Sequence, residues 1–149
     1  MTAPQTFIFI GRSGSGKGTQ AELLIHRFTA LGDQVFYVQT GEQFRKFLET
    51  DSYSGRLAKG MSLAGNRQPD FLAINLWAEL LVNNFQGSEN LLFDGSPRSL
   101  VEAEAMDTAL AFYQRELVHV IAIHVSRTCA ALRLAKRGRS DDDESGIQK

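Results

Sequence analysis

The stretch Gly11-Arg12-Ser13-Gly14-Ser15-Gly16-Lys17-Gly18-Thr19-Gln20 decides the fold of this chain, because it has the spacing of a phosphate-binding loop. An apolar run at residues 7–10 precedes it, and a helical pattern at residues 16–31 follows it. Glycines let successive backbone N–H groups curl around an anion, and the start of the helix faces the same point. The alternative is a glycine-rich turn that binds nothing. The strand, the lysine and the helix in register favour the phosphate loop.

The residues after the lysine bear on how a metal ion would be held. Lys17 supplies a full positive charge aimed at terminal phosphates. Phosphate loops usually have Ser or Thr directly after this lysine, but here Gly18 stands there and Thr19 comes one residue later. We therefore expect Mg²⁺ to be held through water rather than by a direct hydroxyl ligand.

Length, charge and cysteine content restrict the class of protein. A chain of 149 residues that is 43% hydrophobic suits one globular α/β domain. A net charge of −1 without a basic block argues against nucleic acid as the main partner. Cys129 is the only cysteine, which fits a reducing compartment, so we expect a cytoplasmic protein. The N-terminal apolar run is too short to span a membrane, and no membrane partner is expected.

Short apolar runs alternate with helical patterns along the chain. This alternation predicts an α/β fold, with a three-layer parallel sheet and helices on both faces. Between the second and third runs, residues 41–69 contain short helical pieces broken by glycines. This helical insertion either moves as a unit or packs against the sheet, and the local pattern does not choose between the two. The expected buried strands are 7–10, 35–38, 91–93 and 118–125, and the expected helices are 16–31, 69–85 with Pro69 at its first position, 99–114 and 127–137.

A second informative stretch, Asp94-Gly95-Ser96-Pro97-Arg98, follows the third expected strand. The carboxyl end of that strand lies beside the phosphate loop in a parallel sheet, so Asp94 is a candidate to hold Mg²⁺ through water. Arg98 follows a rigid turn, where its planar guanidinium can grip a phosphate. The alternative is a capped turn with a solvated arginine. Next to a phosphate loop, the functional interpretation is favoured.

Further cations occur in two other places. Arg133 and Arg137 share one helix face, and Arg139 follows shortly after. Converging arginines stabilise the charge that phosphoryl transfer spreads over oxygens, although the same spacing also fits a solvated helix end. Arg45, preceded by Thr40, can bind a second phosphate within the insertion. The three histidines His26, His119 and His124 lack metal-ligand spacing and are interpreted as structural.

Four blocks of this sequence, in order and spacing, resemble the adenylate kinases, which are nucleoside monophosphate kinases. Residues 11–20, GRSGSGKGTQ, resemble the phosphate loop of the family. TGEQFR at 40–45 resembles TGDLLR, and FDGSPRSLVEAEAM at 93–106 resembles FDGFPRTxxQAEAL. RLAKRGRSDD at 133–142 resembles the arginine-rich block that leads into the lid. The resemblance covers nearly the whole chain.

The resemblance implies a reversible phosphoryl transfer from MgATP to AMP or a related monophosphate. It implies one P-loop kinase core over 1–149, a monophosphate-binding subdomain over 41–69 and a short lid over 138–142. By position, ATP would contact Gly14, Ser15, Gly16, Lys17, Gly18, Thr19 and Arg133. The monophosphate would contact Thr40, Arg45, Gln68, Gly95, Arg98 and Glu102. Lys17, Arg98, Arg137 and Arg139 would be catalytic, and Asp94 would hold Mg²⁺ through water.

Two substitutions depart from the family pattern in the monophosphate site. Glu102 replaces the glutamine that reads adenine, and Ser96 replaces a phenylalanine. An ionised glutamate only accepts hydrogen bonds, which suits guanine better than adenine. The alternative is that Glu102 pairs with Ser99 in a capping box and leaves the base to other groups. We therefore expect a relaxed or altered monophosphate preference if Glu102 does face the base.

The family continues beyond position 149 with an arginine, a further helix and a fifth strand. We therefore expect weak phosphotransfer by the 149-residue chain. We also expect strand 118–125 to expose an apolar edge that is prone to association, in a protein otherwise expected to be a monomer. The alternative function is a nucleotide-binding module, or a truncated kinase without turnover.

Overall fold

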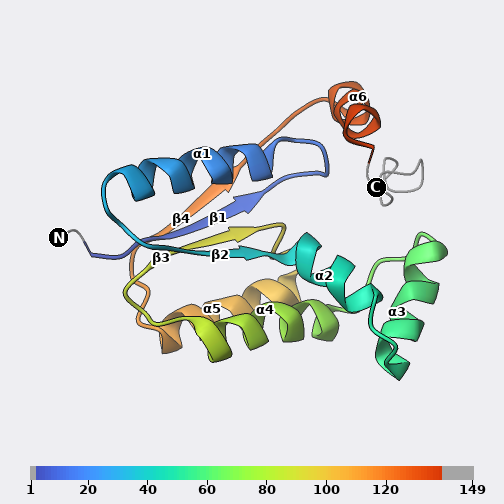
Figure 1. The fold of residues 1–149 in the computed structure, drawn as a ribbon, viewed down its shortest axis with the longest axis horizontal. Coiled ribbons are helices and arrows are strands. Elements are labelled where there is room, and N and C mark those ends of the chain that lie inside the picture. The colour runs from blue at the N-terminus through green and yellow to red at the C-terminus, as the bar shows by residue number, and fades with distance from the viewer. Residues whose placement is uncertain (1–2, 139–149) are drawn as a thin grey trace.

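Four parallel strands form one sheet in the order β2-β3-β1-β4 (Figure 1). The computed structural model describes residues 3–138. The strands are β1 (Thr6–Ile10), β2 (Val35–Gln39), β3 (Asn90–Asp94) and β4 (Val118–Ala122). The helices are α1 (Lys17–Ala30), α2 (Thr40–Leu48), α3 (Tyr53–Leu63), α4 (Asp70–Asn84), α5 (Leu100–Phe112) and α6 (Arg127–Arg137). The predicted α/β fold is confirmed.

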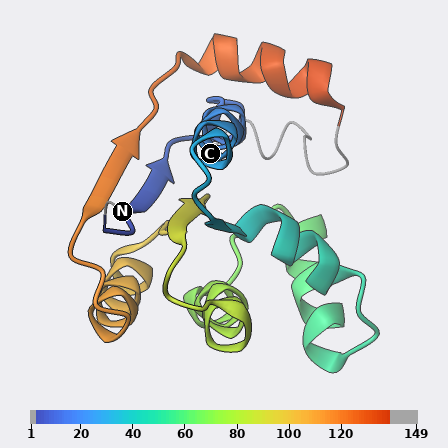
Figure 2. The ribbon, with the colours of Figure 1, turned by 60° about the vertical axis from the view of Figure 1, so that its left-hand side comes forward.

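The sheet lies between two layers of helices. Helices α4 and α5 cover one face, while α1 covers the other, with α6 on the same side as α1 (Figures 1 and 2). Trp77 of α4 packs against Phe93 of the inner strand β3, and the centroids of the two rings are 6.1 Å apart. On the opposite face, Ala21 of α1 packs against Phe9 and Leu92. Strand alternation thus divides the apolar residues between two cores.

Strand β4 differs from its prediction in length and in burial. It ends at Ala122, three residues early, because its partner β1 ends at Ile10, which pairs with Ala122. Val118 and Val120 are 38% and 61% exposed, so the burial expected from the β-branched run is wrong, whereas the strand does have the exposed apolar edge that was also expected. Among the strands of residues 3–138, the strand lies at the edge of the sheet and pairs with β1 alone. An apolar edge of this kind is the feature that promotes association between sheets.

Local signals explain where the helices begin. Pro69 is the N-cap of α4 and not its first helical residue, so that prediction was one residue off. The backbone of Pro69 is extended, with a ψ of 144°, so the helical conformation begins at the next residue, Asp70. Ser99 caps α5 by accepting from the Glu102 N–H at 3.1 Å. The α6 bounds, Arg127–Arg137, agree with the prediction.

The predicted helical insertion consists of α2 and α3. Helix α2 follows directly from the carboxyl end of β2, and α3 packs against α2 rather than against the sheet (Figure 1). Ser52 caps α3 through the Gly55 N–H at 2.9 Å. Of the two interpretations of this segment, the two-helix excursion packed against the sheet does not describe α3.

A buried arginine ties the strand ends together on the side of the sheet away from the phosphate loop. Arg115 is 7% exposed and donates to the Gln5 carbonyl at 2.7 Å and to the Glu89 carbonyl at 3.1 Å. Its Nε donates to Thr6 Oγ1 at 3.1 Å, and its guanidinium lies over the Phe85 ring. Burial lowers the pKa of Arg115, and the Glu89 carboxylate opposes that effect.

Replacing Arg115 with Ala is expected to lower the free energy of unfolding by about 3 kcal/mol, because several buried acceptors lose a charged donor together. Urea unfolding measures this. Arg56→Ala is the matched control, since that side chain is 60% exposed and forms an exposed ion pair with Asp51. Its loss is expected to stay under about 1 kcal/mol. Equal losses in the two variants would contradict the structural role of Arg115.

Among the described residues, no helix combines the length and the apolar character needed to cross a bilayer.

Candidate active site

The loop between β1 and α1 has a backbone conformation that depends on glycine. Gly14 and Gly16 have φ angles of 75° and 99°, in the left-handed region. A Cβ at Gly14 would also lie 2.7 Å from the Ala130 carbonyl oxygen of α6. The α6 backbone therefore closes directly onto the loop, and a side chain at Gly14 would push it away.

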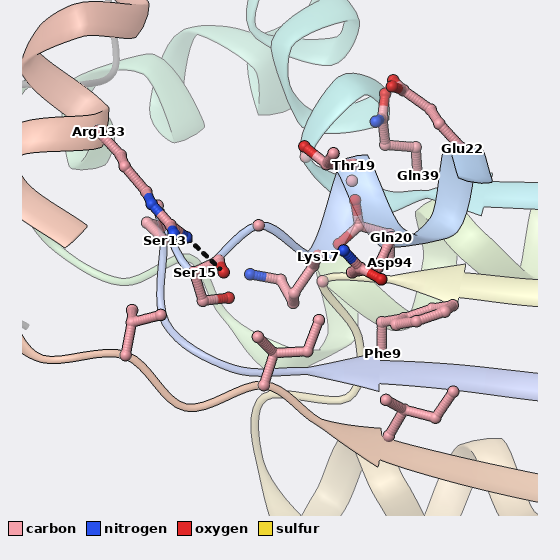
Figure 3. A pocket seen from close by; sticks show the side chains of 18 of the residues that line it. Phe9, Ser13, Ser15, Lys17, Thr19, Gln20, Glu22, Gln39, Asp94 and Arg133 are labelled. Carbon is pink, nitrogen blue, oxygen red and sulfur yellow. Dashed lines mark hydrogen bonds between the residues drawn. The ribbon is translucent and has the colours of Figure 1, made fainter. Parts of the chain in front are cut away.

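Lys17 and Ser15 give the loop the chemistry of an anion site. Lys17 Nζ donates to the Gly11 and Arg12 carbonyls at 2.9 and 3.0 Å. It lies inside the curve of the loop, with Ser15 on one side and Asp94 on the other (Figure 3). Ser15 is 2% exposed, and its hydroxyl has no hydrogen-bond partner among the described residues. A buried donor without a partner, beside an ammonium group, fits a bound phosphate.

The charges around Lys17 are predominantly positive. Burial is the main effect that lowers the pKa of Lys17 below its ordinary 10.5, and Asp94 opposes it. Arg98 and Arg137 lower the pKa of Lys17 further, because each places a second positive charge near the ammonium. Cations held close together repel one another unless an anion lies between them. The arrangement therefore favours a polyanionic ligand.

The loop forms one side of a cavity of about 1200 Å³ at the carboxyl ends of the strands. Ligands bind at this edge in open α/β sheets. The cavity is lined from α1, from α6, from the start of α2 and from the turn after β3. Its cationic lining residues are Lys17, Arg27, Arg45, Arg98, Arg133 and Arg137.

Two arginines of α6 border the loop from above. Arg133 Nη1 donates to the Ser15 carbonyl at 3.0 Å (Figure 3). Arg137 lies one turn further along the same helix and lines the same cavity. The shared helix face expected for these two arginines is therefore directed at the phosphate loop.

The Asp94 carboxylate is held by a second strand. Tyr37 of β2 donates its hydroxyl to Asp94 Oδ2 at 3.1 Å, and Gln39 Nε2 donates to the Tyr37 oxygen at 3.2 Å. Burial, and then the charge of Asp94, raise the pKa of Tyr37, so the phenol remains a donor. The same carboxylate oxygen lies 3.4 Å from where a Cβ on Gly18 would be. Asp94 therefore reaches the start of α1, next to the phosphate loop.

Tyr37 and Gln39 were missed in the sequence analysis. The signal was present in the alternation of β2, because 35, 37 and 39 share one face of the strand. In the parallel register, Gln39 pairs with Asp94. The polar side chains of that face therefore had to lie beside the carboxylate.

The turn after β3 presents Arg98 to the same cavity. Its Nε donates to the Gly95 carbonyl at 2.7 Å, which fixes the guanidinium over the turn. Gly95 has a φ of 89°, and a Cβ there would lie 3.2 Å from Arg98 Nη2. Gly41 and Arg45 of α2 line the same side.

Comparison with known proteins agrees with this geometry. The family model for adenylate kinase matches residues 9–149. The chain belongs to the adenylate kinase family. The adenylate kinases of Flavobacterium psychrophilum and Phocaeicola vulgatus are each 34% identical to it over 146 residues, which cover 95% of this chain and 74% of the relative. That of Porphyromonas gingivalis is 34% identical and is covered to 72%. The chain is thus a nucleoside monophosphate kinase by family, and the family are phosphotransferases.

The cavity contains most of the residues that the adenylate kinase resemblance singled out. All the residues expected at ATP line it: Gly14, Ser15, Gly16, Lys17, Gly18, Thr19 and Arg133. So do Arg45, Gly95, Arg98, Arg137 and Asp94. His124, interpreted as structural, also lines the cavity. Arg139 and residues 139–142 of the expected lid lie outside the described residues.

Three residues expected at the monophosphate do not line the cavity. Gln68 donates to the Ala58 carbonyl at 2.8 Å within the insertion. Thr40 is 1% exposed, and its hydroxyl lies 2.8 Å from that of Ser96. Glu102 is also 1% exposed and accepts from Ser96 and from the Arg98 N–H. Of its two expected roles, this placement favours the helix cap, with the reciprocal bond made to Arg98 instead of Ser99.

Proposed function

We propose that this chain transfers the γ-phosphoryl group of ATP to AMP or a closely related nucleoside monophosphate, in the reaction ATP + AMP = 2 ADP. The supporting observation is one cavity whose cations come from separate elements, with Lys17 on α1, Arg133 on α6, Arg45 on α2 and Arg98 in the turn after β3. Phosphate-loop N–H groups, Lys17 and Arg133 suit the triphosphate, while Arg45 and Arg98 suit a second phosphate. Two anionic substrates placed face to face need this distribution of charge.

The chemistry asks little covalent work of the protein. The transferring group moves in line between two oxygens, and the site supplies position and positive charge. Arg98 and Arg137 line the same cavity as Lys17, and the positive charge of each lowers the pKa of Lys17. They would stabilise the charge that develops on the transferring oxygens.

The residues present also fit Mg²⁺ bound together with ATP. Mg²⁺ keeps several waters and takes few carboxylates, and it neutralises charge on the phosphates. Asp94 is 9% exposed, and Tyr37 orients it toward the first turn of α1. It would hold the ion through water, as the glycine at position 18 leaves no hydroxyl directly after Lys17.

Nucleotide affinity is expected to fall as the pH rises into the alkaline range, earlier than for an ordinary lysine. Lys17 has a lowered pKa in the free chain, and a bound polyphosphate favours its charged form. Binding therefore takes up a proton and weakens once the pH exceeds the pKa of Lys17 in the free chain. Calorimetry of ADP between about pH 7 and 10 measures this, with Lys17→Arg, which stays charged, as control. Identical pH profiles for the two chains would contradict it.

Simultaneous binding of both substrates tests the proposal. AMP is titrated into the chain alone, and into the chain saturated with a non-hydrolysable ATP analogue. The proposal predicts one AMP per chain in both titrations. Loss of AMP binding in the presence of the analogue would indicate a single nucleotide site, and the two-substrate function would be wrong.

A further inference from the structure

A buried chain of hydrogen bonds runs from α2 to α5 behind the acceptor side of the cavity. The Thr40 and Ser96 hydroxyls lie 2.8 Å apart. Ser96 donates to Glu102 Oε1 at 2.6 Å, and the Arg98 N–H donates to Glu102 Oε2 at 2.6 Å. Thr40, Ser96 and Glu102 are each 1% exposed. Neither oxygen of this buried carboxylate is left without a partner.

This chain of hydrogen bonds joins three segments of the protein that meet at one place. Thr40 begins α2, Ser96 lies in the turn after β3, and Glu102 lies in the first turn of α5. The next residues outward, Gly41 and Arg98, line the cavity. The relative position of these two lining residues therefore depends on the bonds behind them.

The protons in this chain have a defined direction. The Ser96 hydroxyl donates its proton to Glu102 Oε1. Ser96 has one proton, and its contact with Thr40 must then be made by the Thr40 proton. Glu102 thus anchors both Thr40, through Ser96, and the Arg98 backbone.

Both carboxylate oxygens of Glu102 already accept a hydrogen bond, and the residue is buried and does not line the cavity. To reach the cavity, it would have to break two short buried bonds and leave Ser96 and the Arg98 N–H without an acceptor. The two departures from the family pattern, at 96 and 102, form a pair. The serine supplies the donor that a buried glutamate needs.

We propose that Glu102 is a positioning residue, which holds the start of α2 at Gly41 and the turn at Arg98 in place for the monophosphate and does not read its base. This inference rests on the proposed function. It implies that the chain selects a nucleoside monophosphate without a base contact from position 102. Substitutions that break these hydrogen bonds would then change the affinities for AMP, GMP, CMP and UMP by a similar factor.

Calorimetry of AMP, GMP, CMP and UMP tests the proposal in four proteins: the unmodified chain, Ser96→Ala, Glu102→Gln and the control Glu104→Gln. Glu104 is an exposed residue of the same helix. Binding of a non-hydrolysable ATP analogue serves as the check of the fold and of the phosphate loop. If Ser96→Ala does not fold, Ser96→Cys replaces it, because a thiol keeps the volume and is a weak donor.

Ser96→Ala is expected to weaken all four monophosphates by a common factor of about tenfold, with the ATP analogue unchanged. Glu102→Gln is expected to leave the AMP-to-GMP affinity ratio within about twofold of the unmodified chain, and Glu104→Gln to change nothing. Unchanged monophosphate affinities in Ser96→Ala would mean that the hydrogen bonds stabilise the fold but do not affect monophosphate binding, and this would overturn the proposal. A shift toward AMP of about tenfold or more in Glu102→Gln would show base reading and overturn it as well. If the unmodified chain binds the ATP analogue and no monophosphate, the proposed function itself fails.

Discussion

Replacing Arg137 with Ala is expected to lower the rate of ADP formation from ATP and AMP by about 10³-fold or more. Arg137 lines the cavity, and its positive charge acts on Lys17, so under the proposed function it would stabilise the negative charge that develops during transfer. Because the charge is greatest in the transition state, the loss should fall on the rate far more than on the affinity for ATP. Steady-state kinetics separates the two effects.

Lys136→Ala is the matched control for this prediction. Lys136 is the neighbouring residue of α6, it is exposed, and it does not line the cavity. Its removal changes the net charge and the helix end equally. A similar loss of rate in both variants would mean that the general field of α6 matters and that Arg137 has no specific role.

Lys17→Ala is expected to weaken ATP binding by about 10- to 150-fold. The estimate corresponds to the loss of a charge-assisted contact of about 1.5–3 kcal/mol. Lys17 Nζ bonds only to two loop carbonyls in the described structure, and it can exchange these for phosphate oxygens. Calorimetric titration with a non-hydrolysable ATP analogue provides the measurement.

The control for Lys17 is Lys59→Ala, on the exposed surface of α3. Circular dichroism should show the same helix content in both variants. If Lys17→Ala binds the analogue as tightly as Lys59→Ala, the loop between β1 and α1 does not bind nucleotide phosphates through its lysine.

Much of the fold was predictable from the sequence, because short motifs and apolar runs largely determine where its strands and helices form. The loop motif placed β1 and α1, and the expected helix at 69–85 corresponds to α4, whose Trp77 and Leu81 are buried. The exposure of β4 was not predictable from its β-branched residues alone. Whether such a strand is central or lies at an edge depends on its neighbours, and its own sequence reads the same in both positions.

The site shows the same division. The residues of the phosphate loop and of α6 were predictable, because each carries its chemistry within a single motif. Tyr37 and Glu102 were harder, since their roles arise from partners on other segments, Asp94 for the first and Ser96 for the second. Taken alone, the glutamate at 102 suggests a changed base preference. Together with the serine at 96, it indicates that the serine supplies a hydrogen bond to a buried carboxylate.

An assay of γ-phosphoryl transfer from ATP to AMP is the most direct test of the proposed function. The chain is incubated with Mg²⁺, AMP and ATP labelled in the γ-phosphate, and the products are separated by chromatography. A label assay also detects slow turnover. The account predicts label in ADP, formed only when AMP is present and lost in Arg137→Ala. Label that stays in ATP, or that appears only as inorganic phosphate, while both nucleotides bind, would contradict it.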